Sequence, residues 1–416
     1  MDIIIGAGVS GLSYAMFSPN TDYRIFEAED QVGGYCKTTV RNGYVWDYSG
    51  HFFHFRDKDI EKLIESYLSD EDIITVEKQT QIKYKNKLVD YPFQQNIHQL
   101  SKPEFIDCLY DLFQATDGQY VNFEQMLYCK FGKSIANKFL IPYNSKLYAC
   151  DLNTLDKDAM GRFFPYAAKE EIIRNFKQSN NRTYNASFVY PKKGAIQYIK
   201  AIVSHVDSSK ILLNTNVIDI DLSTHTLRTA NGEIFQYSRL ISTIPFPMLL
   251  RLCHCSFDED IYSWNQVLVF NLGFAKQGQE LRNHWIYFPE KKYCFYRVGF
   301  YSNILQQDKM SLYVELGFNQ YEKVCPEQYL ERVINDLKKA DILSEDNSLV
   351  DYEAILMNPA YVHIKQQSIA DVQRQKKMLA QHDVYSIGRY GSWTYCSIED
   401  NIKEAQSLAQ SFLHNS

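Results

Sequence analysis

Residues 3–11 have the sequence Ile-Ile-Ile-Gly-Ala-Gly-Val-Ser-Gly, in which a β-branched apolar run is followed directly by three spaced glycines. Such a run is typical of a buried parallel strand, and residues 12–17 predict a helix. We expect Gly6 to permit a tight turn, Gly8 to let the backbone approach a pyrophosphate, and Gly11 to let the helix pack closely on the strand. The N-terminus of that helix would direct N–H groups and a partial positive charge at the phosphates.

A second predicted strand makes this glycine motif a specific signal. Residues 23–27 have the sequence Tyr-Arg-Ile-Phe-Glu, so the strand ends in the acidic residue Glu27. Glu27 follows the first glycine by about 20 residues, the distance at which dinucleotide-binding folds place the acceptor for a ribose hydroxyl. Residues 3–27 therefore predict a dinucleotide-binding unit.

The segment after Glu27 favours FAD over NAD. Gly33 and Gly34, followed by Lys37, resemble the second glycine pair of the large FAD-binding family that includes amine oxidases and protoporphyrinogen oxidases. In that family these positions wrap the diphosphate of the cofactor, so the resemblance implies this role for Gly33, Gly34 and Lys37. A solvated Gly-Gly turn is the alternative.

The C-terminal region also resembles that family. Residues 388–391, Gly-Arg-Tyr-Gly, follow the apolar residues 384–387 and resemble the C-terminal flavin strand, which implies cofactor contacts at Gly388 and Arg389. A helix over about residues 400–412 would direct its N-terminus at the flavin.

We therefore predict an α/β fold with a Rossmann-like FAD-binding domain, an inserted helical domain and an antiparallel β-sheet domain. The FAD-binding domain is expected at residues 1–80, 190–245 and 375–416, the helical domain at 98–185, and the sheet domain at 81–97 and 246–372. The FAD-binding domain is thus assembled from both ends of the chain.

Motifs along the whole chain resemble those of the UDP-galactopyranose mutase family. They are residues 91–94 (YPFQ), 142–144 (PYN), 161–162 (GR), Arg297 and residues 388–393 (GRYGSW), and they occur in the order of that family. The resemblance implies an isomerase that interconverts the pyranose and furanose forms of a nucleotide-diphosphate sugar. UDP-galactopyranose would be the first substrate to expect, and the galactofuranose product would supply polysaccharide biosynthesis.

The same resemblance implies how the cofactor is used. Reduced FAD acts through its N5 atom as a nucleophile, and the sugar undergoes no net oxidation. NADPH or NADH would be the external reductant.

The site residues are also implied by this resemblance. Arg162 and Arg297 match the two arginines that hold the diphosphate, a task for which guanidinium groups suit phosphate oxygens. Gly50 and His51 match the loop beside the reactive edge of the flavin. The positions that match the nucleotide pocket are Tyr91, Gln94, Phe139, Asn144, Tyr148 and Tyr287, and the tyrosines whose hydroxyls would reach the diphosphate are Tyr361 and Tyr395.

Residues 399–401, Glu-Asp-Asn, depart from the family, in which an Asn-containing segment lies over the sugar and the flavin. An ionised carboxylate only accepts hydrogen bonds, so an acid here would change what is offered to a sugar hydroxyl. Another hexose, a deoxy or N-acetyl sugar, or a dTDP-linked donor are therefore alternatives to UDP-galactose.

Composition excludes several classes of protein. The 416 residues are 45% hydrophobic and 23% charged, as in an ordinary soluble protein of two or three domains. A formal charge of −6 argues against nucleic-acid binding. The nine cysteines form no CxxC pair, so we expect no metal site. With no run of 18 apolar residues and an acidic start, the chain is expected to be cytoplasmic and without a membrane span. Whether it forms a homo-oligomer stays open.

Two other functions are compatible with the fingerprint. An FAD-dependent amine oxidase or desaturase would need an apolar substrate tunnel and no paired phosphate arginines. A non-catalytic dinucleotide-binding scaffold would have no reason to carry Arg162, Arg297 and Tyr395 in register.

Overall fold

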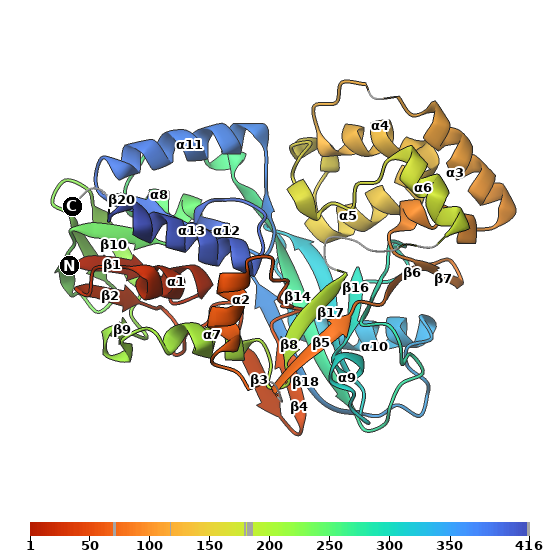
Figure 1. Cartoon of the computed structure of the whole chain (residues 1–416), viewed down its shortest axis with the longest axis horizontal. Helices are drawn as coiled ribbons and strands as arrows, with labels where there is room; N and C mark the ends of the chain where they lie inside the picture. The colour runs from red at the N-terminus through yellow and green to blue at the C-terminus, as the bar shows by residue number, and fades with distance from the viewer. Residues whose placement is uncertain (70–71, 117, 179, 181–185, 414–416) are drawn as a thin grey trace.

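A parallel sheet lies at the end of the molecule that holds both chain termini (Figure 1). The computed structural model describes residues 1–69, 72–116, 118–178, 180 and 186–413. The five strands have the order β20-β13-β1-β2-β9 and pair in parallel throughout: β20 (Val384–Ser386), β13 (Arg239–Ser242), β1 (Asp2–Ile5), β2 (Tyr23–Phe26) and β9 (Ile211–Leu212). Central β1 is buried along its whole length, as the apolar run in the sequence predicts.

Helices from both ends of the chain cover this sheet. They are α1 (Val9–Phe17), α2 (Lys58–Glu65), α7 (Ile196–Val203), α8 (Phe246–Leu252), α11 (Gln366–Ala380), α12 (Gly388–Gly391) and α13 (Ile398–Ser411). The helix α1 packs against both α7 and α13. A small antiparallel sheet of β10 (Val217–Asp221), β11 (Thr226–Thr229) and β12 (Ile234–Gln236) lies beside them.

The two ends of the chain are joined by one side chain at the start of α13. The Oδ1 atom of Asn401 accepts hydrogen bonds from Ser10 Oγ at 3.0 Å and from the backbone N–H of Arg389 at 2.7 Å. A Cβ atom on Gly388, whose φ is +85°, would lie 2.3 Å from Ser10 Oγ, so only glycine permits this approach. The glycine fingerprint and the C-terminal flavin motif therefore form one structural unit.

A second, mainly antiparallel sheet occupies the middle of the molecule (Figure 1). Its main order is β18 (Leu349–Met357), β14 (Ser263–Phe274), β17 (Ser311–Asn319), β16 (Arg297–Phe300), β15 (Trp285–Tyr287), β6 (Thr80–Tyr84) and β7 (Lys87–Asp90), and β19 (Val362–His363) pairs with β14. The pair β15–β6 is parallel, and the other pairs are antiparallel. Two antiparallel strand pairs adjoin it. They are β3 (Thr38–Arg41) with β4 (Tyr44–Asp47), and β5 (Ile73–Glu77) with β8 (Ser187–Pro191).

Alternation along β14 gives the large sheet two buried faces. Val267 and Val269 belong to the apolar cluster shared with the helical segment. Leu268 and Phe270 belong to the opposite cluster, under α10 (Leu330–Lys339). The helix α9 (Tyr301–Leu305) follows β16 directly.

A group of helices lies at the far end of the molecule from the chain termini (Figure 1). It contains α3 (Lys102–Gln114), α4 (Phe123–Ile135), the π-helical turn η4 (Ala136–Leu140), α5 (Ile141–Tyr148) and α6 (Lys169–Lys177), with the short 3₁₀ turns η2 (Phe93–Gln95), η3 (Ile97–Gln99), η5 (Leu152–Thr154) and η6 (Gly161–Phe163). The helix α5 lies directly on β17, because a Cβ on Gly317 would be 2.2 Å from the carbonyl oxygen of Lys146.

The predicted fold class, a parallel α/β unit with helical and antiparallel parts, is confirmed. The domain boundaries stay a prediction. Residues 181–185 and 414–416, at the ends of the predicted helical and FAD-binding domains, lie outside the described residues. Within the described part of the chain, no helix is long and apolar enough to cross a membrane.

Substituting alanine for Gly11 should destabilise the protein. A Cβ there would lie 2.0 Å from the carbonyl oxygen of Gly6 and 3.1 Å from Ile4 Cγ2, so α1 would have to move off β1. We expect a loss of about 1–3 kcal/mol in the free energy of unfolding, measured with urea. Alanine is otherwise the better helix former, so the loss reports the clash alone. Gly118→Ala is the control, because the nearest atoms to its Cβ are 4.0 Å away, and an equal loss there would contradict the explanation.

Candidate functional site

A cavity of about 950 Å³ lies where the FAD fingerprint, the large sheet and the helical group meet. Its walls include parts of residues 6–10, 27–36, 49–54, 160–166, 357–361 and 389–401, together with side chains of β15, β16 and β17. Segments more than 300 residues apart therefore contribute to one site.

The glycines of the fingerprint form one wall by direct backbone contact. Gly8 and Gly34 face each other, and a Cβ on Gly34 would lie 3.4 Å from Gly8 Cα. The N–H of Gly33 donates to the carbonyl oxygen of Ala7 at 2.9 Å. Because neither Gly8 nor Gly34 has a side chain, a group as wide as a diphosphate can lie directly against the backbone of this wall.

Glu27 lies at the edge of this wall. Its two carboxylate oxygens accept the N–H groups of Ala7 at 2.8 Å and Glu29 at 3.0 Å, which ties β2 to the glycine turn. Burial raises the pKa of Glu27, although these hydrogen bonds oppose the shift. Carboxylate oxygens have further lone pairs, so Glu27 can still accept a hydroxyl from a ribose.

Three predicted cofactor residues lie behind the cavity wall. Gly11 packs on β1, Gly388 packs on Ser10, and Lys37 forms an ion pair with Glu29. Of the other predicted cofactor residues, the cavity lining includes Gly6, Gly8, Glu27, Gly33, Gly34, Gly50 and Arg389. The glycines and Glu27 fit the adenosine-diphosphate part of FAD, and these roles stay predictions.

The loop before His51 is attached to the large sheet. Ser49 Oγ donates to the carboxylate of Glu315, and a Cβ on Gly50 would lie 2.7 Å from the hydroxyl oxygen of Tyr313. His51 lines the cavity, and its Nδ1 atom has no hydrogen-bond partner among the described residues. Burial, together with the charges of Arg389 and Arg297, lowers the pKa of His51 to about 4, so the ring is neutral at pH 7.

Arg297 and Glu315 are direct cross-strand partners on β16 and β17. The guanidinium holds the carboxylate through two atoms, with Nη2 donating to Oε1 at 2.7 Å. Glu315 is only 1% exposed. Burial alone would lower the pKa of Arg297, but Glu315 raises it well above its usual value. Sequence analysis missed Glu315, although a lone acid within the apolar run of residues 312–318 is a signal for a buried ion pair.

Arg389 lies beside the rings of Tyr361 and Tyr395, which stack on each other with their centres 5.8 Å apart. Its guanidinium carbon is 5.1 Å and 4.7 Å from the two ring centres, within the range of cation–π contacts. Its Nε atom is buried and has no hydrogen-bond partner in the described part of the chain. Arg389 is therefore a buried cation that still has a donor to offer to an anionic or carbonyl group in the cavity.

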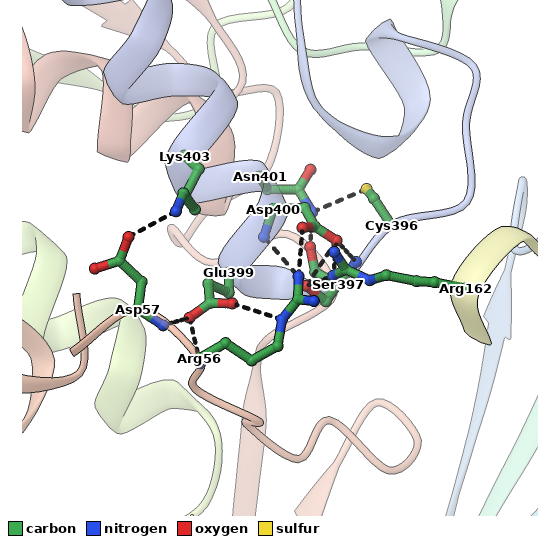
Figure 2. Close-up of polar contacts among 9 residues, drawn as sticks. All are labelled: Arg56, Asp57, Arg162, Cys396, Ser397, Glu399, Asp400, Asn401 and Lys403. Atoms are coloured by element: carbon green, nitrogen blue, oxygen red, sulfur yellow. Dashed lines mark hydrogen bonds and ion pairs between the residues drawn. The ribbon is translucent and has the colours of Figure 1, made fainter. Parts of the chain in front are cut away.

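Arg162, on η6, reaches the start of α13 from the other side of the cavity (Figure 2). Its Nη2 atom donates to Asp400 Oδ2 at 2.6 Å and to Ser397 Oγ at 3.3 Å. The neighbouring Glu399 accepts the N–H groups of Arg56 and Asp57, both at 2.7 Å. Both acids that depart from the mutase pattern thus have partners within the protein.

The predicted nucleotide residues are only partly brought together. Tyr91 and Tyr287 line the cavity with their ring centres 4.9 Å apart. Among the described residues, Gln94, Phe139, Asn144 and Tyr148 do not line the cavity. The lining contains Gln95, Tyr143 and Leu147 instead.

The phase of α5 explains this difference. Tyr143 and Leu147 are one helical turn apart and share the face toward the cavity. Asn144 instead donates to the carbonyl oxygen of Leu140 at 2.7 Å, and Tyr148 packs on His363. Asn144 and Tyr148 have the same i, i+4 spacing, so spacing alone could not have shown which of the two faces lines the cavity.

Comparisons with known proteins agree with this geometry. The family described as "Flavin containing amine oxidoreductase" matches residues 10–352. Coproporphyrinogen III oxidase from Staphylococcus aureus (strain NCTC 8325 / PS 47) is 25% identical over 286 residues, which are 59% of this chain. The match spans 61% of the length of that relative.

Solved structures show the same fold over the whole chain. The crystal structure of reduced UDP-galactopyranose mutase superposes with a TM-score of 0.92 at 24% identity, covering 100% of this chain and 96% of the other. Cyclohexylamine oxidase from Brevibacterium oxydans IH-35A has a TM-score of 0.72 at 13% identity, with 100% and 98% covered. The resemblance to UDP-galactopyranose mutase is therefore confirmed at the level of the fold.

The stability of the protein should fall as the pH is lowered from about 6.5 toward 4. Burial lowers the pKa of His51, His54, His284 and His363 to about 4 in each case. In this window the unfolded chain binds protons that the folded protein does not, so acid favours unfolding. Replacing His51 by Gln removes one of these protons. The slope of the free energy of unfolding against pH, measured with urea, should then fall by about 1.4 kcal/mol per pH unit. An unchanged slope would contradict the conclusion that His51 is neutral in the folded protein.

The ion pair in the large sheet should show strong coupling between its partners. Glu315→Leu leaves Arg297 unpaired, and we expect a loss of about 3–5 kcal/mol in the free energy of unfolding. The double variant Arg297→Met/Glu315→Leu should recover most of this loss, because neither charge is then buried. Denaturant unfolding of the single and double variants measures the coupling, and simply additive losses would show that the pair is not coupled.

Proposed function

The chain belongs to the flavin-containing amine oxidoreductase family, and within it we propose a flavin-dependent isomerase that interconverts the pyranose and furanose forms of a nucleotide-diphosphate sugar. UDP-galactopyranose is the first substrate to test. The observation that supports this most directly is the placement of Arg162, Arg297 and Arg389 around the cavity beside the glycine wall. The fold shared with UDP-galactopyranose mutase is consistent with it.

The cavity residues also fit FAD. Gly8, Gly34 and Glu27 would hold the adenosine-diphosphate part. His51 Nδ1 and Arg389 Nε, which have no hydrogen-bond partner among the described residues, would be available to the flavin end. Reduced FAD, when bound, supplies an N5 atom that can act as a nucleophile toward the anomeric carbon of a sugar. NADPH or NADH is proposed as the external reductant.

Positive charge would hold the nucleotide through the reaction. Arg162 would bind the diphosphate both in the substrate and as a leaving group, because a guanidinium group donates to two phosphate oxygens at once. Arg297, whose Nε and Nη2 atoms are held by Glu315, would donate to the diphosphate through its remaining N–H groups. The hydroxyls of Tyr361 and Tyr395 would add donors, and both of these rings contact Arg389. Fixed donors stabilise the charge that develops as the diphosphate leaves.

Aromatic side chains would bind the base and exclude water. Tyr91 and Tyr143 both contact Tyr287, and their ring centres lie 4.9 Å and 5.1 Å from that of Tyr287. Rings of this kind can stack on a pyrimidine. Because Gln95 and Tyr143 line the cavity, we assign base contacts to them ahead of Gln94 and Asn144.

An oxidase is the alternative that the family membership leaves open. Protonated amines carry positive charge, so three arginines around the cavity disfavour them as substrates. The relative from Staphylococcus aureus is named a coproporphyrinogen III oxidase, which makes coproporphyrinogen III the second substrate to test. Oxidation of either substrate in air would release hydrogen peroxide.

The deciding assay is performed without oxygen. The protein is reduced with dithionite, UDP-galactopyranose is added, and the nucleotide sugars are separated by chromatography with mass detection. We expect a new peak of identical mass that is absent with oxidised protein. Arg297→Lys should lower kcat/KM about ten- to a hundredfold, because a hydrogen bond to a charged group is worth about 1.5–3 kcal/mol.

Arg374→Lys is the matched control for that variant. Arg374 lies on α11, is exposed, and pairs with Asp371 away from the cavity, so its replacement should leave the rate unchanged. If the FAD-loaded, reduced protein converts neither a UDP-sugar nor a dTDP-sugar, the isomerase proposal is refuted. Peroxide release from coproporphyrinogen III or an amine would establish the oxidase instead.

A further inference from the structure

One ion pair joins the helical side of the cavity to its FAD-binding side. Arg162 belongs to η6, in the segment between η5 and α6, and Asp400 lies in the first turn of α13. Figure 2 shows the arginine reaching from its turn to the start of the helix, where Nη2 lies 2.6 Å from Asp400 Oδ2. The two residues are 238 positions apart in the sequence.

The carboxylate of Asp400 is held in place independently of Arg162. Its Oδ2 atom accepts the backbone N–H and the hydroxyl of Ser397, both at 2.8 Å, and Ser397 Oγ accepts the N–H of Asp400 at 3.1 Å. This reciprocal arrangement is a capping box. Burial opposes the charge on Asp400, but the bonds from Ser397 and Arg162 outweigh it and keep its pKa below the usual value.

The segment that carries Arg162 forms a wall of the cavity. Met160, Phe163 and Phe164 line it, and the Phe163 ring meets Tyr395 edge to face at 5.0 Å. Movement of Arg162 would therefore change the opening beside a tyrosine predicted to contact the diphosphate.

The pair differs from the one between Arg297 and Glu315 in its access to water. The side chains of Arg162 and Asp400 are 35% and 25% exposed, whereas those of Arg297 and Glu315 are 19% and 2% exposed. Contacts with water lower the cost of breaking an ion pair. Arg162 can thus exchange its carboxylate for another anion, while Arg297 keeps its own.

We propose that Asp400 competes with the diphosphate of the nucleotide for Arg162 and so limits how tightly the nucleotide is held. The inference rests on the proposed function, because it takes a nucleotide diphosphate as the ligand. A proton of Nη2 that bonds to Asp400 is not available to a phosphate oxygen, and the two anions repel each other. The carboxylate gives Arg162 a partner when the product leaves, which favours release.

The test compares UDP binding to the oxidised, FAD-loaded protein and to Asp400→Asn, by calorimetry. Asparagine keeps an oxygen that can accept the N–H of Ser397, so the helix cap is retained while the charge is lost. We expect UDP to bind about two- to fivefold more tightly to the variant, the range of a partly exposed ion pair. A residue with a purely structural role would weaken binding when replaced.

Asp57→Asn is the matched control. Asp57 also caps a helix, α2, and pairs with Lys403 of α13 at 2.6 Å, and no dashed line joins it to Arg162 in Figure 2. The same charge is removed close by, so a general electrostatic effect would tighten UDP binding in both variants. Competition for Arg162 predicts tightening in Asp400→Asn alone.

Trypsin gives a readout that does not depend on the ligand. The bond after Arg162 should be cut several-fold faster in ligand-free Asp400→Asn than in the parent protein or in Asp57→Asn. The bond after Lys403 should be cut at the same rate in Asp400→Asn as in the parent protein. Equal or weaker UDP binding by Asp400→Asn, or equal tightening in Asp57→Asn, overturns the inference and leaves the proposed function intact. A parent protein that binds no UDP overturns both.

Discussion

The buried ion pair between Arg297 and Glu315 is the constraint on which the arrangement of the cavity depends. A carboxylate with 1% exposure must be paired, and the register of β16 against β17 places its partner directly opposite. Glu315 also accepts a hydrogen bond from Ser49, which holds the loop that carries His51. The register of the sheet therefore determines where the predicted flavin-side histidine lies.

Three arginines supply positive charge to the cavity, and each of them has different partners. Arg297 is paired with a buried carboxylate within the sheet, and Arg162 is paired with a partly exposed one. Arg389 lies beside two tyrosine rings and has an Nε atom without a partner among the described residues. A site of this kind suits a ligand with several negative charges, which can engage Arg162, Arg389 and the N–H groups of Arg297 that Glu315 leaves free.

The cofactor site can form only when the two ends of the chain meet. Asn401 bonds to Ser10 and Arg389 at once, and Gly388 leaves room for that contact. A ligand that binds only this assembled state stabilises it by mass action. FAD binding and the docking of α13 on the fingerprint are thus linked energetically.

The sequence by itself determined the FAD-binding unit and its fold class. Gly6, Gly8 and Glu27 could be assigned because a tight turn, a bare backbone and an acceptor at a strand end are local requirements, each met by few residue types. The placement of Arg162, Arg297 and five tyrosines in one cavity was predicted from family resemblance. The structure brings both arginines and four of these tyrosines together, namely Tyr91, Tyr287, Tyr361 and Tyr395.

Tertiary structure alone decided which neighbour in each motif faces the cavity. The choice of Tyr143 over Asn144 depends on the phase of α5, which follows a π-helical turn that shifts the helix face. The pairing of Asp400 with Arg162 depends on how η6 approaches α13. Backbone requirements are local and therefore visible in sequence, whereas the partner of a charged side chain is set by elements that meet only in the folded chain.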